Sequence, residues 1–200
     1  MTNLFPMFLK LEGRPCLVVG AGTVAEGKIG SLLLAGATVR VVAPQANAAV
    51  QEWARTSAIR WEEREFSPLD LDDVFLVVVA TSSKDVNESV FDEAQSRNVL
   101  CNVVDDPEHC HFYYPAVVRR GQLQIAISTA GESPALAQKL RGELESQYGP
   151  EYEGWVEQLG KTRRELFARD LDPEKRRRRL HELASKPPLA AELISKGEGS

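Results

Sequence analysis

Cysteine is scarce in this chain of 200 residues. Its three cysteines, Cys16, Cys101 and Cys110, are an odd number and form no C-x-x-C pair. This pattern does not fit a disulfide framework, which needs paired cysteines and an oxidising compartment. We therefore interpret all three as reduced thiols and expect a cytoplasmic protein.

Long hydrophobic runs and excess positive charge are also lacking. The longest apolar run, residues 74–80, is far too short to cross a membrane. Residues 1–10 contain neither a basic segment nor a long apolar core, so we expect no signal peptide. The net charge of −5 excludes binding of nucleic acid through the overall charge of the molecule. We expect neither a membrane nor nucleic acid among the partners.

A glycine motif follows the first apolar strand. Residues 16–19 lead into Gly20-x-Gly22-x-x-Ala25, and a helical pattern continues to residue 35. In dinucleotide-binding folds the first glycine permits a tight turn and the second lets the backbone approach a pyrophosphate. A small third residue lets the helix pack closely on the strand, and the helix N-terminus binds phosphates. The motif therefore predicts a dinucleotide site.

Strand and helix patterns alternate as far as residue 104. Strands are predicted at 38–43, 59–65, 74–80 and 99–104, and helices at 24–35, 46–55 and 87–96. This alternation predicts a doubly wound parallel sheet with right-handed crossovers, and the charged strand 59–65 belongs at its edge. Residues 4–12 form an extended lead-in, in which Phe5, Phe8 and Leu11 are predicted core contacts.

The pattern changes after residue 104. Two strands joined by a turn are predicted at 112–121 and 123–128, and a helix begins with Pro134 at its first position. Residues 151–195 are charged and helical in pattern. Their basic run, 175–179, fits either a solvated helix face, which we favour, or attraction of a polyanion.

The end of the second predicted strand lacks the usual ribose-binding acid. That acid lies about 20 residues after the glycines in the common fingerprint, whereas residues 42–45 read Val-Ala-Pro-Gln. Three interpretations stay open: backbone atoms near Ala43 hold the ribose, a phosphate lies there instead, or no dinucleotide binds. Arg40 would favour NADP if it faced the cofactor, but it fits a surface side chain of the strand equally well. We favour NAD.

A carboxylate follows the buried strand 99–104. Ligands of open α/β sheets bind at the carboxyl ends of the strands, so Asp105 is a candidate base, provided that burial brings its pKa toward the working pH. The alternative is that Asp105 or Asp106 caps a turn before Pro107.

Two further segments contain reactive side chains. Neighbouring residues of an extended segment point to opposite faces, so His109, Cys110 and His111 cannot all reach one ion, and we expect no metal site. One histidine could still assist proton transfer. The loop 128–133 fits an anion-binding loop and an ordinary capped helix start equally well.

The order of these motifs resembles the precorrin-2 dehydrogenase family, also known as the siroheme synthase N-terminal family, over nearly the whole chain. The specific elements are residues 101–105 (Cys-Asn-Val-Val-Asp) and the loop Ile-Ser-Thr-Ala-Gly followed by Ser-Pro at 127–134. Further matches are residues 6–11, 16–25, 78–81 and 115–121, together with Lys28.

The resemblance implies NAD-dependent oxidation of precorrin-2 to sirohydrochlorin by a cytoplasmic homodimer. It implies a Rossmann-like parallel sheet with NAD bound by residues 1–112, a small α+β dimerisation segment at 113–147 and a helical C-terminal region at 148–200. Some relatives also insert a metal into sirohydrochlorin, and fused relatives carry a methyltransferase domain that we do not expect here.

The resemblance also assigns residues to roles. Asp105 matches the general acid/base. The expected cofactor-binding residues are Gly20, Gly22, Thr23, Val24, Ala25, Ala43, Pro44, Thr81, Asn102 and Val103. The expected substrate-binding residues are Ser128, Thr129, Arg119, Arg120 and His111. The missing ribose acid is normal for this family.

A rival hypothesis from another class is a nucleotide-sensing regulatory module without catalysis. It predicts an acid after the second strand and gives no role to Asp105 or to the loop 128–134.

Overall fold

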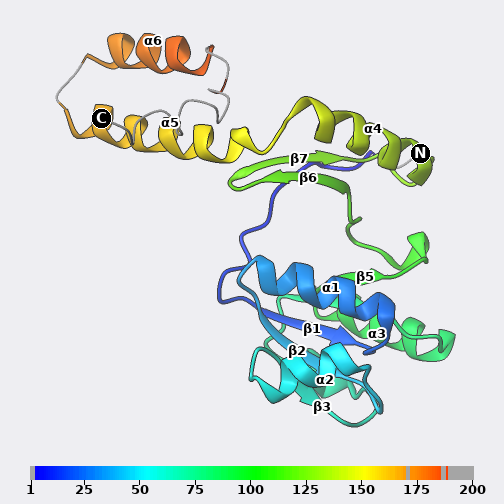
Figure 1. Cartoon of the computed structure of the whole chain (residues 1–200). Coiled ribbons are helices and arrows are strands. Elements are labelled where there is room, and N and C mark those ends of the chain that lie inside the picture. Colours follow the sequence, from blue (N-terminus) through cyan, green and yellow to red (C-terminus); the bar gives the residue numbers. More distant parts are fainter. Residues whose placement is uncertain (1–2, 170–171, 186–187, 189–200) are drawn as a thin grey trace. The chain divides into compact units, whose positions relative to one another are not determined.

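The computed structural model describes residues 3–169, 172–185 and 188 (Figure 1). The chain divides into two units, Met1–Tyr114 and Pro115–Ser200. This division lies close to the predicted boundary at residue 112. The boundary predicted at residue 147, within the second unit, stays a prediction.

The first unit is built on a parallel sheet of five strands in the order β3-β2-β1-β4-β5. The strands are β1 Pro15–Val19, β2 Thr38–Val42, β3 Arg60–Glu62, β4 Leu76–Val79 and β5 Leu100–Val103. The helices between them are α1 Thr23–Leu34, α2 Ala48–Arg55 and α3 Lys84–Ser96, with short 3₁₀ turns η1 Pro68–Leu71 and η2 Pro107–His109. The predicted Rossmann-like sheet is confirmed, and the charged strand β3 lies at its edge.

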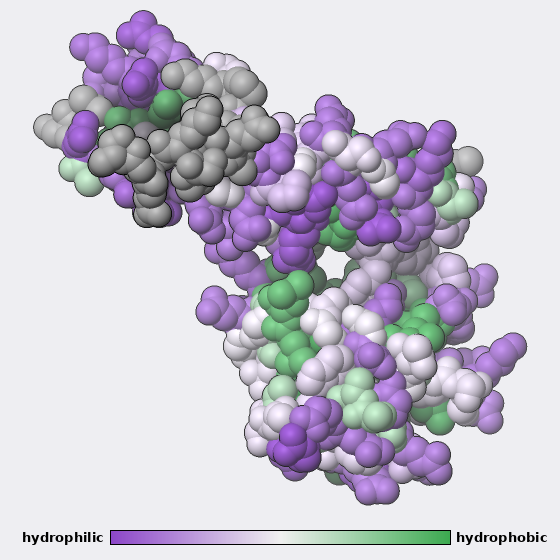
Figure 2. All heavy atoms as spheres, in the orientation of Figure 1, coloured by the Kyte–Doolittle hydropathy of each residue, from purple (hydrophilic) through white to green (hydrophobic). Residues whose placement is uncertain are grey.

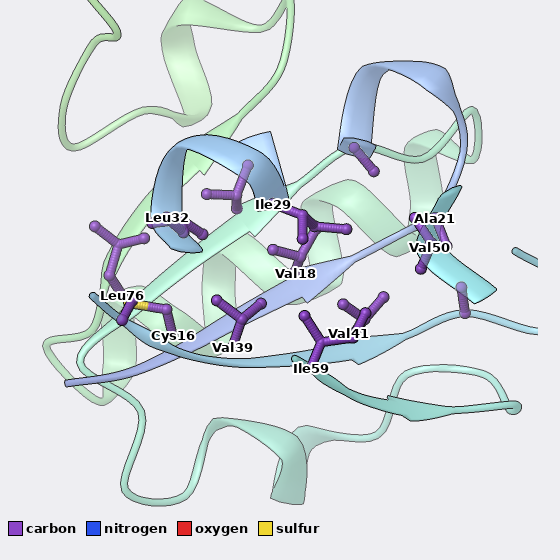
Figure 3. Packing of buried hydrophobic residues seen from close by; sticks show 14 of the residues in the cluster. Cys16, Val18, Ala21, Ile29, Leu32, Val39, Val41, Val50, Ile59 and Leu76 are labelled. Carbon is purple, nitrogen blue, oxygen red and sulfur yellow. The ribbon is translucent and has the colours of Figure 1, made fainter. Parts of the chain in front are cut away.

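Hydrophobic cores cover both faces of this sheet. On one face Val18 and Val41 pack with Ile29 of α1 and Val50 of α2 (Figure 3). On the other face Val77 and Val79 pack with residues of α3. Because successive side chains of a strand point to opposite faces, only a strand that is apolar throughout can fill both cores. This explains why the uninterrupted apolar runs identified the central strands.

Helix α3 begins three residues earlier than the pattern 87–96 indicated. The Ser83 hydroxyl accepts a hydrogen bond from the Val86 N–H at 3.4 Å and serves as N-cap. A serine cap satisfies one of the free N–H groups of the first turn, so a polar residue starts the helix.

The expectation for the N-terminal segment was partly wrong. Leu11 is buried, but Phe5 and Phe8 are 79% and 66% exposed. Residues 3–11 form no strand and so have no place in the sheet. Apolar character alone does not show whether a side chain reaches the core of its own chain.

The second unit starts with the antiparallel pair β6 Ala116–Arg120 and β7 Leu123–Ile127, followed by α4 Pro134–Gln147. The Ser133 hydroxyl caps α4 by accepting from the Leu136 N–H. Helices α5 Glu151–Ala168 and α6 Pro173–Ala184 confirm the helical region as far as it is described, while residues 189–195 lie outside the described residues. The unit shows a mainly hydrophilic surface in Figure 2. None of the described helices is long and apolar enough to span a membrane.

A buried carboxylate organises the edge of the sheet next to β2 and β3. Asp70 is 2% exposed and accepts hydrogen bonds from the guanidinium groups of Arg40 (3.0 Å) and Arg64 (2.6 and 2.8 Å) and from the Ser67 N–H (2.8 Å). Burial raises the pKa of Asp70, but the hydrogen bonds from Arg64 and Ser67 and the charges of Arg64 and Arg40 outweigh it and leave the pKa below its ordinary value. We call Asp70, Arg40, Arg64 and Glu62 the Asp70 cluster.

Replacing Asp70 by asparagine should lower the free energy of unfolding by about 2–3 kcal/mol at pH 7, because two arginines lose a buried anionic partner. The folded-state pKa lies below the unfolded value, so the carboxylate stabilises the fold above about pH 4 and the contribution disappears as the pH falls further. Urea denaturation of Asp70→Asn and of the exposed control Asp73→Asn measures this. Equal midpoints at pH 7 would contradict the assignment.

Candidate active site

A cavity of about 820 Å³ runs along the carboxyl edge of the five-stranded sheet. Its volume lies in the range of small-molecule and cofactor sites. Segments that follow all five strands line it: Glu65 and Phe66 after β3, residues 42–45 after β2, 19–24 after β1, 80–83 and Val86 after β4, and Val104 and Asp105 after β5. This is the edge where open α/β sheets bind their ligands.

The glycine loop lies at the middle of the cavity, after the central strand β1. Gly20 has φ +105°, and a Cβ there would come within 2.8 Å of the Ala80 carbonyl carbon. Gly22 is the N-cap of α1 and supplies no side-chain cap, so the N–H groups of the first turn are free for a phosphate. Ala25 is fully buried and lies outside the lining, which fits the predicted close packing of helix on strand, while its predicted contact with the cofactor stays a prediction.

The segment after β2 is held in place before any ligand binds. The Asn47 N–H donates to the Ala21 carbonyl at 3.0 Å, and the Asn47 amide donates to Glu26 at 2.7 Å. The Trp61 indole N–H donates to the Ala43 carbonyl at 3.0 Å. These bonds attach the loop that contains Ala43 and Pro44 to the glycine loop and to β3, so this half of the cavity is preformed.

The strand order resembles that of dinucleotide-binding folds, in which the pyrophosphate lies at the glycine loop and the adenosine ribose at the end of the second strand. A dinucleotide bound in this way would extend its nicotinamide half over β4 and β5. With neighbouring strands about 4.8 Å apart, the edge from β3 to β5 measures about 19 Å, which suits an extended dinucleotide.

Asp105 lies at the β5 end of this edge and lines the cavity. It adopts φ +62°, a left-handed conformation that aspartate tolerates better than most residues and that is often found at functional sites. The side chain is exposed. The sequence argument required a buried carboxylate, and in this structure Asp105 is exposed instead.

A cation lies near Asp105 within the same unit. Lys28 of α1 is half-buried, and its ammonium group lies 3.7 Å from the centroid of the Tyr114 ring. Burial lowers the pKa of Lys28, and the charges of Asp105 and Cys110 oppose this shift. Lys28 appeared in the sequence only as part of a motif, whereas in the structure its charge interacts electrostatically with that of the candidate base.

Asn102 and Val103 are buried and do not line the cavity. The Asn102 amide donates to the Phe112 carbonyl at 2.8 Å and to the Cys110 sulfur at 3.2 Å. In this structure Asn102 therefore fixes the segment that follows Asp105, and its predicted contact with the cofactor stays a prediction.

The two histidines after Asp105 are engaged in local contacts. His109 lies 2.7 Å from the Asp106 carboxylate, which raises its pKa. His111 accepts from the Cys101 N–H at 3.1 Å. No group of three potential metal ligands occurs within the part of the chain that the structure describes. The substrate contact predicted for His111 stays a prediction.

The expected substrate residues of the second unit lie in a turn and on a strand. The hydroxyl of Ser128 accepts from the Ala130 N–H, and that of Thr129 accepts from the Ser133 N–H, both at 3.1 Å. Arg120 donates to the carbonyls of Tyr148 (2.8 Å) and Glu145 (3.0 Å), which engages its guanidinium in attaching β6 to the end of α4. Arg119 is exposed. Their contacts with substrate stay predictions.

Several lining residues were not among the expected site residues, namely Val19, Ala21, Val42, Gln45, Glu65, Phe66, Ala80, Ser82, Ser83, Val86 and Val104. Each ends or follows a strand whose position was predicted. The missing information was the strand order, which places the segment after β3 beside the end of β2.

Family models match both units. A model described as "Putative NAD(P)-binding" matches residues 7–116, and one described as "Sirohaem biosynthesis protein central" matches residues 120–147. The first match confirms the prediction of a nicotinamide dinucleotide as cofactor.

Individual proteins agree with the family models. The chain is 38% identical to a siroheme synthase of Photorhabdus laumondii over 98% of its length, and 47% identical to siroheme synthase 1 of Cronobacter sakazakii over 70% of its length. It covers 41% and 30% of these relatives, so it spans less than half of their length. A solved structure titled "SirC, precorrin-2 dehydrogenase" matches with a TM-score of 0.81 and 31% identity, covering 92% of this chain and 90% of that one.

Proposed function

Because the chain belongs to the precorrin-2 dehydrogenase family, we propose that it oxidises precorrin-2 to sirohydrochlorin with NAD, a step of sirohaem biosynthesis. The observation that supports this most is the cavity: one sheet edge combines the glycine loop and the hydrogen-bonded loop after β2 with the Asp105 carboxylate at its β5 end. Forming the new double bond removes a hydride and a proton from the substrate. NAD, when bound, accepts the hydride.

The residues of this chain bind the cofactor and accept the proton. The free N–H groups at the start of α1 hold the pyrophosphate, and the loop around Ala43 and Pro44 holds the adenosine half. The Asp105 carboxylate accepts the proton that leaves the substrate. Lys28 adds a positive charge near this point, which suits a substrate with many carboxylates.

The candidate contacts with the substrate complete the proposal. Ser128, Thr129, Arg119 and Arg120 belong to the second unit, and His111 belongs to the first. A homodimer, formed through residues 113–147, and a cytoplasmic location belong to the same proposal, which rests here on the family. Insertion of a metal into sirohydrochlorin is a further activity that rests on the family alone. It is tested separately by adding ferrous or cobaltous ion to the protein with sirohydrochlorin.

Incubation of the protein with precorrin-2 and NAD should produce sirohydrochlorin and NADH in equal amounts. The absorbance of each product measures its formation. Binding of NADH is measured in parallel through the intrinsic tryptophan fluorescence. A protein that binds NADH but never turns over precorrin-2 would fit the nucleotide-sensing module and contradict the enzyme.

A further inference from the structure

The charged side chains that line the cavity are all acidic. Among the described residues that line it, the ionisable side chains are Glu65 and Asp105, and none is a lysine, arginine or histidine. Asp105 follows β5 at the nicotinamide end. Glu65 follows β3 at the opposite, adenosine end and is exposed there. Its carboxylate has no assigned role.

The backbone places Glu65 beside the end of β2. Glu62 is the register partner of Val42, and the Ala43 N–H donates to the Glu62 carbonyl at 3.2 Å. The segment that carries Glu65 therefore leaves β3 beside the end of β2, and it lines the same cavity as residues 42–45, where the usual ribose-binding acid is missing. An acid at this point of the fold accepts a hydrogen bond from the ribose 2′-hydroxyl, whereas a nearby arginine accommodates the 2′-phosphate of NADP.

The arginines of this region are already engaged. Arg40 and Arg64 both donate to Asp70, and Arg60 lies 3.2 Å from the Glu62 carboxylate. A guanidinium bound to a buried carboxylate would have to break those hydrogen bonds to reach a phosphate. The Asp70 cluster thus holds Arg40 and Arg64 in hydrogen bonds with which a 2′-phosphate would have to compete, whereas Arg60 is paired with Glu62 at the exposed surface.

The same cluster fixes the backbone that carries Glu65. Arg64 donates to the Glu65 carbonyl at 2.9 Å while its other nitrogen binds Asp70. The Ser67 N–H is bound by Asp70 as well. Residues on both sides of Glu65 are therefore anchored to one buried group, so the exposed carboxylate projects from a defined backbone.

We propose that Glu65 replaces the missing acid of the second strand and makes the site specific for NAD. Its carboxylate accepts a hydrogen bond from the 2′-hydroxyl of the adenosine ribose and repels the 2′-phosphate of NADP, while the Asp70 cluster keeps Arg40 and Arg64 away from that position. This inference rests on the proposed function, because it assumes that the cavity binds the cofactor in the direction given by the strand order.

Binding of NADH and NADPH tests the proposal without any turnover. Trp61 contacts Ala43 through its indole N–H, so tryptophan fluorescence reports on nucleotide at the adenosine end. The variants are Glu65→Gln and the control Glu63→Gln, which changes an exposed acid two residues away that does not line the cavity. Both positions are exposed, so both variants should fold, and urea denaturation verifies it.

The wild type should bind NADH at least about tenfold more tightly than NADPH. Glu65→Gln should weaken NADH binding about tenfold, the value of one hydrogen bond to a charged group, and strengthen NADPH binding, so that the preference disappears. Glu63→Gln should retain the wild-type preference.

The outcomes separate the two proposals. If the wild type binds both nucleotides equally, or if Glu65→Gln keeps the full preference for NADH, Glu65 does not determine the cofactor specificity. That result contradicts this inference and leaves the proposed function intact. If neither nucleotide binds to the wild type, the proposed function falls with it.

Discussion

Replacing Asp105 by asparagine should slow the oxidation of precorrin-2 by about 10²- to 10⁴-fold, the usual contribution of a positioned general base. Asparagine cannot accept the proton, but it keeps the size of the side chain and its hydrogen-bonding carbonyl. It also tolerates the left-handed conformation of residue 105, φ +62°, which alanine adopts less readily. The rate is measured as NADH formed in a single turnover with saturating precorrin-2 and NAD.

Nucleotide binding distinguishes a lost base from a damaged site. The affinity of Asp105→Asn for NADH should stay within about threefold of the wild type, because the pyrophosphate and adenosine sites are unchanged. The matched control is Asp106→Asn, since the Asp106 carboxylate binds His109 and does not line the cavity. Equal rate losses in the two variants would contradict the role of Asp105 as the base.

The sequence was sufficient for those parts of the fold that depend on local patterns. The apolar runs at β1 and β4 identified the central strands because both of their faces are covered. The glycine motif identified the pyrophosphate loop because Gly20 needs a positive φ and a close approach to Ala80. The glycine motif depends on residues that are near one another in the chain, and the apolar runs depend on burial of both faces of a strand.

The parts that could not be predicted depend on neighbours distant in the chain. Glu65 looked like one more charge on an edge strand, and only the pairing of β3 with β2 places it in the cavity. The side chain of Arg40 fitted either a cofactor contact or the surface, and no local pattern shows that it binds Asp70, thirty residues later. Phe5 and Phe8 were expected in the core on apolar character alone, which says nothing of which surface covers them.

In the second unit, too, local patterns predicted the helices and strands but not the contacts with the substrate. The pair β6 and β7 and the helix α4 were predicted from alternation and from a capped proline start. Whether Ser128 and Arg119 contact the substrate depends on where this unit lies when the substrate is bound. No local pattern contains that information, so these contacts stay predictions for the turnover experiments to test.

Replacing Gly20 by alanine should both destabilise the first unit and abolish nucleotide binding. The new Cβ would lie 2.8 Å from the Ala80 carbonyl carbon and closer still to its oxygen, and φ +105° is rarely adopted by residues with a side chain. Overpacking against a backbone group and an unfavourable conformation each cost about 1–3 kcal/mol, so we expect a loss of about 2–6 kcal/mol. Urea denaturation and NADH fluorescence measure the two effects.

Gly27 provides the matched control because it lies seven residues further on, within α1, and a Cβ there meets nothing within 4 Å. Alanine in an exposed helix interior is favoured over glycine by about 1 kcal/mol, so Gly27→Ala should stabilise the protein and leave NADH affinity unchanged. The two glycine-to-alanine changes thus have opposite predicted signs. If the loop moves to relieve the clash at residue 20, stability recovers but the N–H groups at the start of α1 lose their alignment, so binding should still fail. A Gly20→Ala protein that binds NADH like the wild type would contradict the assignment of the pyrophosphate to this loop.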